Sequence, residues 1–281
     1  MLPAVARRHP QAVRTSILAL VLVVLIAVIL SHLERFFLFF PTSEITTTPA
    51  ELGVYYEDVY FTTDDGHRLN GWFIPGTSEI TWLWLHGNGG NISHRTQEIA
   101  QNHHLLGVNL FIFDYRGYGK SQGTPSEQGT YRDARAALAY LRSRPDVAPD
   151  QIVYFGRSLG AAVAVKLAVE HPPQGMILVA PFASLSDMAR IHYPAIPGAA
   201  WLARNRYNSL ARISANESPL LILHGDQDAI VPLSQGRKLF EAANQPKQFQ
   251  LLPGAGHDDT YLTRRGAYWG TISSFLETLN E

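Results

Sequence analysis

Past about Leu52, short runs of β-branched and aromatic residues alternate with longer stretches of helical periodicity. Eight runs predict strands, at residues 54–61, 67–74, 81–87, 109–115, 151–156, 175–181, 219–225 and 247–253. The helical stretches lie at residues 93–106, 131–144, 159–170, 233–243 and 265–279. This alternation is typical of an α/β fold with a mostly parallel sheet and helices on both faces, and we expect antiparallel strands to open it.

The segment from Ser184 to Ser218 interrupts the alternation. It contains Pro194 and Pro197 and shows no strand pattern, although it follows a predicted strand. Because ligands of open parallel sheets bind beyond the carboxyl ends of the strands, an insertion at this point is well placed to cover a site. We therefore expect residues 184–218 to form a small cap on a domain that spans residues 41–281.

An apolar run near the N-terminus stands apart from these elements. Residues 16–30 contain no charge, glycine or proline; Arg7, Arg8 and Arg14 precede them, and only Arg35 follows closely. At about 1.5 Å per residue the run is short for a hydrocarbon layer of about 30 Å, unless flanking residues or a thinned bilayer make up the difference. We expect an uncleaved single-pass membrane helix, with the N-terminus in the cytoplasm and the folded domain on the outer, extracytoplasmic side.

A cleaved signal peptide is the main alternative to this anchor. Such a peptide ends in small residues, whereas here the run is followed by the sequence SHLER. A buried core helix is disfavoured because the run is apolar on every face. The stretch FFLFFP at residues 36–41 has two interpretations of equal standing, an aromatic belt at the membrane interface or the first apolar edge of the domain. We assign residues 1–40 to the tail and anchor.

Composition narrows the possible functions. A chain that is 46% hydrophobic and 17% charged is expected to bury a core rather than to be disordered. A net charge of -1 with scattered Lys and Arg gives no basic surface for nucleic acid, so we expect no nucleic-acid partner. With no cysteine, the chain has no disulfide, no thiolate metal site and no cysteine nucleophile. The oligomeric state stays open.

The sequence Gly156-Arg157-Ser158-Leu159-Gly160 is a G-x-S-x-G motif between a predicted strand and a predicted helix. Glycines at these positions permit a sharp turn that exposes the serine hydroxyl above the N-terminus of the helix. A serine in this position is a nucleophile once a base removes its proton. The motif therefore predicts Ser158 as the nucleophile.

A histidine base and a carboxylate are expected downstream of this serine, in the order serine, acid, histidine. The strand at 219–225 leads into Asp226-Gln227-Asp228, and the last strand leads into a glycine-rich loop that contains His257. We predict His257 as the general base and Asp228 as the acid. Asp226 is the alternative acid, because it lies nearer the strand end and is also placed to cap the turn.

Two backbone N–H groups are needed to stabilise a negatively charged carbonyl oxygen in such a site. Leu159 follows the nucleophile, and Asn88 lies in the glycine-rich loop His86-Gly87-Asn88-Gly89-Gly90 after the third strand, so these two residues are the predicted donors. His86 precedes the acid in the chain, and we interpret it as structural. The other histidines, His94, His103, His104 and His192 among them, lack metal-ligand spacing, so no metal or other cofactor is expected.

These motifs resemble those of the α/β-hydrolase superfamily, in particular membrane-anchored YfhR-like proteins and relatives of protein depalmitoylases. The segments that carry the resemblance are FFP (39–41), HGNGGNISHR (86–95), FDYRGYGKSQG (113–123), GRSLG (156–160), APFASL (180–185), HGDQDAIVP (224–232) and GAGHDD (254–259). The resemblance implies that Asp114, Tyr115 and Arg116 support the site without taking part in chemistry. Unlike the depalmitoylases, this chain has no N-terminal cysteine cluster.

Together, the residues and the resemblance predict a serine hydrolase of the esterase, thioesterase or lipase type. It is expected to act on a small-molecule or lipid-like acyl substrate through an acyl-enzyme on Ser158. A serine peptidase resembling an aminopeptidase is an alternative, and so is a non-catalytic membrane scaffold that keeps the fold. An intact set of three catalytic groups argues against the scaffold.

Overall fold

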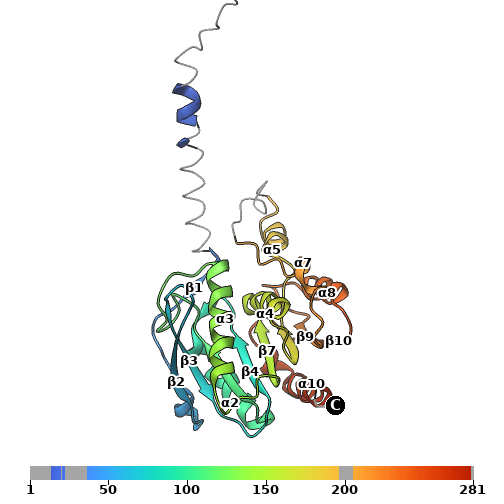
Figure 1. Ribbon diagram of the computed structural model, residues 1–281. Helices are drawn as coiled ribbons and strands as arrows, with labels where there is room; N and C mark the ends of the chain where they lie inside the picture. The colour runs from blue at the N-terminus through green and yellow to red at the C-terminus, as the bar shows by residue number, and fades with distance from the viewer. Residues whose placement is uncertain (1–13, 20, 23–36, 196–204, 280–281) are drawn as a thin grey trace, which may run out of the picture.

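One sheet of eight strands organises the chain in a computed structural model, which describes residues 14–19, 21–22, 37–195 and 205–279 (Figure 1). The strand order is β10-β9-β8-β7-β4-β6-β3-β2. The strands are β2 (Glu57–Thr62), β3 (Arg68–Ile74), β4 (Thr81–Leu85), β6 (Asn109–Phe113), β7 (Ile152–Arg157), β8 (Gly175–Val179), β9 (Leu220–Gly225) and β10 (Lys247–Leu252). β3 pairs antiparallel with both β2 and β6, and the remaining pairs are parallel. The mostly parallel sheet of the predicted fold class and all eight predicted strands are thus confirmed.

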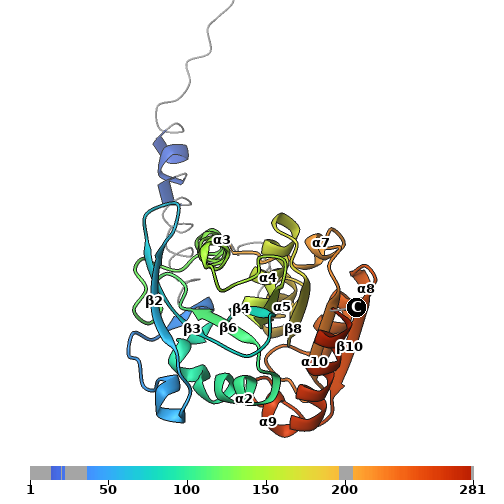
Figure 2. The ribbon, with the colours of Figure 1, turned by 60° about the horizontal axis from the view of Figure 1, so that its bottom comes forward.

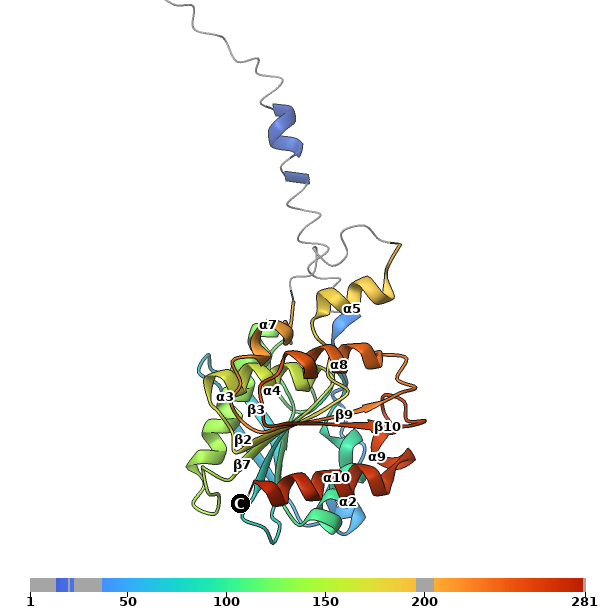
Figure 3. The ribbon, with the colours of Figure 1, turned by 90° about the vertical axis from the view of Figure 1, so that its right-hand side faces the viewer.

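Helices cover both faces of the sheet, as the alternating pattern predicts. On one face lie α3 (Glu127–Ser143), α4 (Leu159–Glu170) and α8 (Leu233–Ala242), and on the other lie α2 (Thr96–Leu106) and α10 (Arg265–Thr278) (Figures 2 and 3). Shorter elements are η1 (Pro49–Leu52), η2 (Ile92–Arg95), α5 (Leu185–His192), α7 (Leu210–Ile213) and α9 (Thr260–Thr263). β1 (Phe40–Pro41) and β5 (Gly89–Gly90) form a separate parallel pair.

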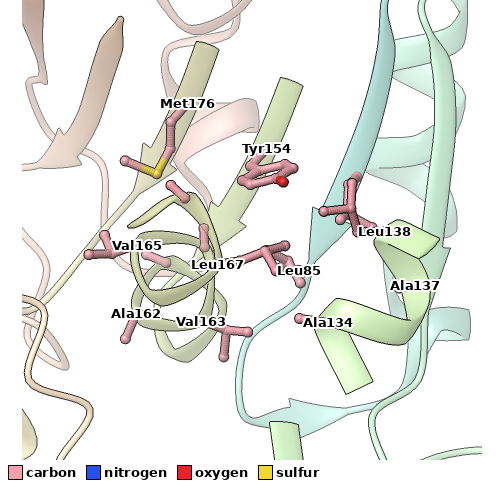
Figure 4. Close-up of a cluster of buried hydrophobic side chains, with 14 of the residues drawn as sticks. Leu85, Ala134, Ala137, Leu138, Tyr154, Ala162, Val163, Val165, Leu167 and Met176 are labelled. Atoms are coloured by element: carbon pink, nitrogen blue, oxygen red, sulfur yellow. The ribbon is translucent and has the colours of Figure 1, made fainter. Parts of the chain in front are cut away.

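The period of two along the strands divides the core into two layers. In β4, Leu83 and Leu85 pack with the first group of helices, whereas Trp82 and Trp84 pack on the opposite face. Figure 4 shows Leu85 beside side chains of α3 and α4. On the other face, the rings of Trp82 and Phe155 stack with centroids 4.7 Å apart. Every residue of β4 is buried, as expected for a strand covered on both sides.

The expected cap contains α5 and α7, and its residues 196–204 lie outside the described residues. Its base is held against the N-terminus of α3. The Tyr207 hydroxyl is 2.8 Å from the Thr130 hydroxyl, and the Tyr207 N–H donates to the Glu127 carboxylate at 3.1 Å. Tyr207 is fully buried, so this side of the cap is a fixed part of the domain.

The domain begins earlier than the boundary drawn from the sequence. Phe39 is only 4% exposed and packs edge-on against Tyr207, with ring centroids 6.5 Å apart. Phe40 pairs with Gly89 in the β1–β5 ladder. These two residues, which the sequence-based boundary assigned to the anchor, therefore belong to the folded domain. Phe37, by contrast, is 71% exposed.

The expected membrane run is described only in part. Residues 16–19 and 21–22 are helical, and residues 20 and 23–30 lie outside the described residues. Within the described ranges, no helix has both the length and the apolar character that crossing a bilayer requires. Membrane anchoring therefore stays a prediction.

Close backbone packing at the start of α4 yields a test of the fold. A β-carbon on Gly160 would overlap the carbonyl oxygen of Leu85 in β4, whereas one on Gly270, within α10, would meet no atom within 4 Å. We expect Gly160→Ala to destabilise the protein by about 3 kcal/mol or more, because backbone atoms have to move apart. Gly270→Ala is the matched control and is expected to stabilise by about 0.5–1 kcal/mol. Denaturant unfolding measures both, and similar effects of the two substitutions would contradict this packing.

Candidate active site

Ser158 lies at the turn between β7 and α4, in a backbone conformation that is rare for any residue except glycine. Its φ is 53° and its ψ is -114°. The turn is sharp because the flanking glycines allow close approach: a β-carbon on Gly156 would lie 2.7 Å from the Ala161 Cα. The Ser158 N–H donates to the Val179 carbonyl in β8 at 2.9 Å, which fixes the turn to the sheet. The serine is thus held in a strained conformation by its surroundings.

Asp228 and His257 meet at the carboxyl ends of β9 and β10. The distance between Asp228 Oδ2 and His257 Nδ1 is 2.7 Å. The second carboxylate oxygen accepts the backbone N–H groups of Ile230 and Val231, at 3.0 and 2.7 Å. The Asp228 carboxylate is fully buried and the His257 side chain is 9% exposed. Because a carboxylate only accepts hydrogen bonds, His257 carries its proton on Nδ1, which leaves Nε2 as an acceptor.

Asp226, the alternative acid, has a different partner. Its Oδ1 accepts the N–H of Gly254 at 2.7 Å, and the neighbouring Gln227 N–H donates to the Ala255 carbonyl at 3.0 Å. These bonds join the end of β9 to the loop that carries His257. Of the two acids considered from the sequence, the structure therefore places Asp228 beside the histidine and Asp226 at the turn.

Ser158, His257 and Asn88 line one cavity of about 510 Å³. The remaining lining residues come from β1 and the segment after it, the glycine-rich loop, η2, the end of β7 and the loops after β9 and β10, namely Phe40, Thr42, Gly87, Gly89, Gly90, His94, Arg95, Arg157, Ile230 and Asp258. Leu159, the other predicted donor, is the first residue of α4 and is 2% exposed. The first N–H groups of a helix have no acceptor within that helix.

The loop that contains Asn88 is held from two sides. The Asn88 carbonyl accepts the Phe40 N–H at 3.0 Å and the Tyr118 hydroxyl at 2.8 Å, and the Asn88 side-chain amide donates to the Leu38 carbonyl at 2.9 Å. The Asn88 backbone N–H donates to no atom of the residues described. The bonds to the Asn88 carbonyl orient the peptide plane between Asn88 and Gly89, and the Asn88 N–H, in the preceding plane, is available to a ligand.

His86 lies outside the cavity lining and is fully buried beside Asp114. Its Nδ1 is 2.7 Å from the Gly87 carbonyl, and its Nε2 is 3.6 Å from Asp114 Oδ1. Burial lowers the pKa of His86 to about 3 and raises the pKa of Asp114 to about 8. Both groups are therefore neutral near pH 7. His86 supports the loop through Gly87, which agrees with its structural interpretation.

The other residues of the DYRGYG segment make supporting contacts. The Tyr115 hydroxyl donates to the His86 carbonyl at 3.2 Å. Arg116 pairs with Asp133 at 2.8 Å and with Asp65 at 2.9 Å. None of Asp114, Tyr115 and Arg116 lines the cavity.

Sequence reasoning missed Arg157, the residue just before Ser158. Its guanidinium is buried and pairs with Glu98 of α2 at 2.7 Å. It also donates to the Thr260 hydroxyl at 3.0 Å and to the His257 carbonyl at 3.2 Å. Arg157 thereby ties the turn that carries Ser158 to the loop that carries His257. A charged residue at the end of a strand that is otherwise apolar was the available signal.

Comparisons with known proteins agree with this architecture. Residues 80–216 match the family described as serine aminopeptidase, S33. The chain is 34% identical to YfhR of Salmonella typhimurium over 292 residues, covering 96% of this chain and 97% of YfhR. It is 37% identical to WAV2 of Arabidopsis thaliana, an alpha/beta hydrolase domain-containing protein, over 82% of this chain and 81% of WAV2. An esterase of Pyrococcus furiosus superimposes with a TM-score of 0.72 at 22% identity, covering 87% of this chain and 98% of the esterase.

The chain therefore belongs to the α/β-hydrolase superfamily. Among its members it is similar to YfhR along nearly the whole length of both proteins, as the motifs indicate.

The buried pair His86 and Asp114 yields a test by pH. The pKa of the Asp114 carboxyl is about 8 in the folded protein and about 3.9 in an unfolded chain, so its contribution to stability is full below pH 4 and is lost as the pH rises towards 8. Asp114→Asn removes this loss, and the variant should gain stability relative to the wild type between pH 5 and pH 8.5. His86 stays uncharged in the folded state over this range in both proteins.

Thermal unfolding at the two pH values measures this change, and the exposed Asp150→Asn is the control. Its effect should be the same at both pH values. If the difference between Asp114→Asn and the wild type does not change with pH, Asp114 does not hold a proton in the folded protein.

Proposed function

We propose that this protein is a serine hydrolase that cleaves carboxylic ester or thioester bonds in acyl or lipid-like substrates. The observation that carries the proposal is the 2.7 Å contact between Asp228 and His257 in a cavity that Ser158 also lines. The membership in the hydrolase superfamily supports it as well. Ser158 is the proposed nucleophile, His257 the base and Asp228 the acid that orients it.

In the first half-reaction, His257 Nε2 takes the proton of the Ser158 hydroxyl while the serine oxygen attacks the substrate carbonyl carbon. The carbonyl oxygen becomes negatively charged and is stabilised by the N–H groups of Asn88 and Leu159 and by the N-terminus of α4. Collapse of this intermediate breaks the bond to the leaving group. The leaving oxygen or sulfur takes the proton from His257, and the acyl group stays on Ser158.

In the second half-reaction, His257 removes a proton from water, and the resulting hydroxide attacks the acyl-enzyme. The bond to Ser158 breaks, the serine recovers its proton from His257, and a carboxylic acid leaves. Asp228 accepts the hydrogen bond of His257 Nδ1 and stabilises the imidazolium that forms in each step. Its two backbone hydrogen bonds keep the carboxylate in place for this task.

We further propose that residues 16–30 hold the enzyme on a membrane, with the catalytic domain on the outer side. Support comes from the uncharged run and from the arginines that precede it. In the described part of the run, Ile17, Leu18, Val21 and Leu22 are 55–69% exposed, as apolar side chains would be if lipid surrounded them. An enzyme held at a bilayer meets lipid-like substrates at high effective concentration.

A peptidase is the second candidate, favoured by the family description that matches residues 80–216. An aminopeptidase has to bind the ammonium group of its substrate, for which carboxylates are the natural partners. The cavity lining offers one aspartate, Asp258, and two arginines, of which Arg157 is paired with Glu98 and Arg95 has no carboxylate partner among the described residues. We therefore favour the esterase. Parallel assays of 4-nitrophenyl butyrate and an amino acid 4-nitroanilide distinguish the two chemistries.

Replacing Ser158 tests the nucleophile. We expect Ser158→Ala to lower kcat for 4-nitrophenyl butyrate by a factor on the order of 10⁶, because the groups of such a site act as a unit. The variant should also lose labelling by a fluorophosphonate probe. Ser143→Ala, at an exposed serine at the end of α3, is the control and should behave as the wild type does. A wild-type protein that is neither labelled nor active would favour the non-catalytic scaffold.

Replacing the two acids tests which of them orients the histidine. Asp228→Asn presents an N–H to His257 Nδ1, favours the wrong tautomer, and should lower kcat by about 10⁴. Asp226→Asn is the matched control, since its remaining oxygen still accepts the Gly254 N–H, and it should cost less than about tenfold. Steady-state kinetics of both variants measures the ranking, and the reverse ranking would make Asp226 the acid.

A further inference from the structure

Arg95 brings a positive charge to the cavity and forms no ion pair with a carboxylate of the residues that the structure describes. It is the last residue of η2, between the Asn88 loop and α2, and it lines the cavity together with Ser158. One hydrogen bond involves its side chain among the residues described: Nη2 donates to the Gly89 carbonyl at 2.7 Å. Its Nε is buried and has no hydrogen-bond partner in the described part of the protein. A guanidinium has five N–H donors, and among the described residues only this one bond to Gly89 uses them.

The other arginine that lines the cavity, Arg157, already has a carboxylate partner. Arg157 pairs with the Glu98 carboxylate at 2.7 Å, whereas Arg95 forms no ion pair with any carboxylate of the described residues. Glu98 and Asp258 act on Arg95 only at longer range, and Arg157 repels it. Burial lowers the pKa of the Arg95 guanidinium, which nevertheless stays charged because an arginine does not lose its proton in proteins. The Arg95 side chain is only partly buried, but its Nε lies out of reach of solvent, and a buried donor without an acceptor is costly unless a ligand supplies that acceptor.

The position of Arg95 links this charge to the proposed reaction. Its guanidinium contacts Gly89, the residue directly after Asn88, whose N–H is a proposed donor to the substrate carbonyl oxygen. An anionic group bound by Arg95 would therefore be a short spacer away from the bond that is cleaved. We infer that the substrates are esters or thioesters that carry a carboxylate or phosphate near the scissile carbonyl, and that Arg95 binds this anion. This inference rests on the proposed function.

A purely structural role for Arg95 makes a different prediction. If the side chain only supports the Gly89 carbonyl and hence the loop, its removal lowers the rate for every substrate by the same factor. If it binds an anion, its removal is felt by charged substrates above all. Pairs of substrates that differ only in one anionic group separate these roles, and the activity on the neutral member tests the proposed function independently.

The first pair is 4-nitrophenyl hexanoate and mono-4-nitrophenyl adipate, which have acyl chains of equal length and differ in a terminal carboxylate. The second pair is 1-butyrylglycerol and its 3-phosphate, which places the anion on the alcohol side. With the full-length protein, Arg95→Gln should lower kcat/KM for at least one anionic member by about 10- to 100-fold more than for its neutral partner. Arg95→Lys should recover part of the difference, and the pair that responds identifies the side that carries the anion.

The exposed Arg142 on α3 supplies the matched control, because Arg142→Gln changes the same net charge far from the cavity lining. It should affect both members of each pair equally. If Arg95→Gln does not fold, the wild type still provides the test: raising the salt concentration should lower kcat/KM for the anionic member of a pair and spare the neutral one.

Three results bear on the two proposals separately. Equal losses on charged and neutral substrates in both pairs overturn the anion site and leave the hydrolase standing. The anion site is also overturned if the wild type does not prefer the anionic member of either pair, or if neither Arg95→Gln nor added salt reduces that preference. Failure to hydrolyse all four esters, together with no fluorophosphonate labelling of Ser158, overturns the proposed function itself.

Discussion

The contact between the start of α4 and the end of β4 determines where the parts of the site lie. Gly160 lies directly against the carbonyl groups of Leu85 and His86, with no room for a side chain. This contact brings the turn that carries Ser158 next to the loop that carries Asn88, although more than sixty residues separate them in the chain. Since the strained backbone of Ser158 is stable only while its neighbours are fixed, the packing of two backbones precedes any chemistry here.

Much of the architecture could be predicted because it depends on local pattern. The strands and helices follow from apolar periodicity, and the position of Ser158 follows from two glycines between a strand and a helix. The acid was harder to choose. Asp226 and Asp228 are two residues apart after the same strand, so only the path of the loop, with its bonds to Ile230 and Val231, decides which of them faces His257.

What the sequence could not predict are contacts between distant segments. Arg157 meets Glu98 and Thr260 across 59 and 103 residues, and nothing near any of them in the sequence records the pairing. The ladder of Phe40–Pro41 with Gly89–Gly90 is two residues long, too short to produce a periodic pattern. Phe39 and Phe40 were assigned to the anchor for a related reason. An aromatic run has the same appearance in the sequence whether it lies at a membrane surface or at the edge of a core, and only its contacts with distant residues distinguish the two.

The β1 strand also has a mechanical consequence. Phe40 lies ten residues after the end of the proposed anchor, residues 16–30. Its N–H donates to the carbonyl of Asn88, whose own N–H is proposed to face the substrate. A pull on the proposed anchor would therefore reach the Asn88–Gly89 peptide through this hydrogen bond. Bilayer thickness, curvature and lateral pressure all alter such a pull. For an enzyme anchored as we propose, the expected consequence is a rate that depends on the physical state of the membrane, with no second ligand involved.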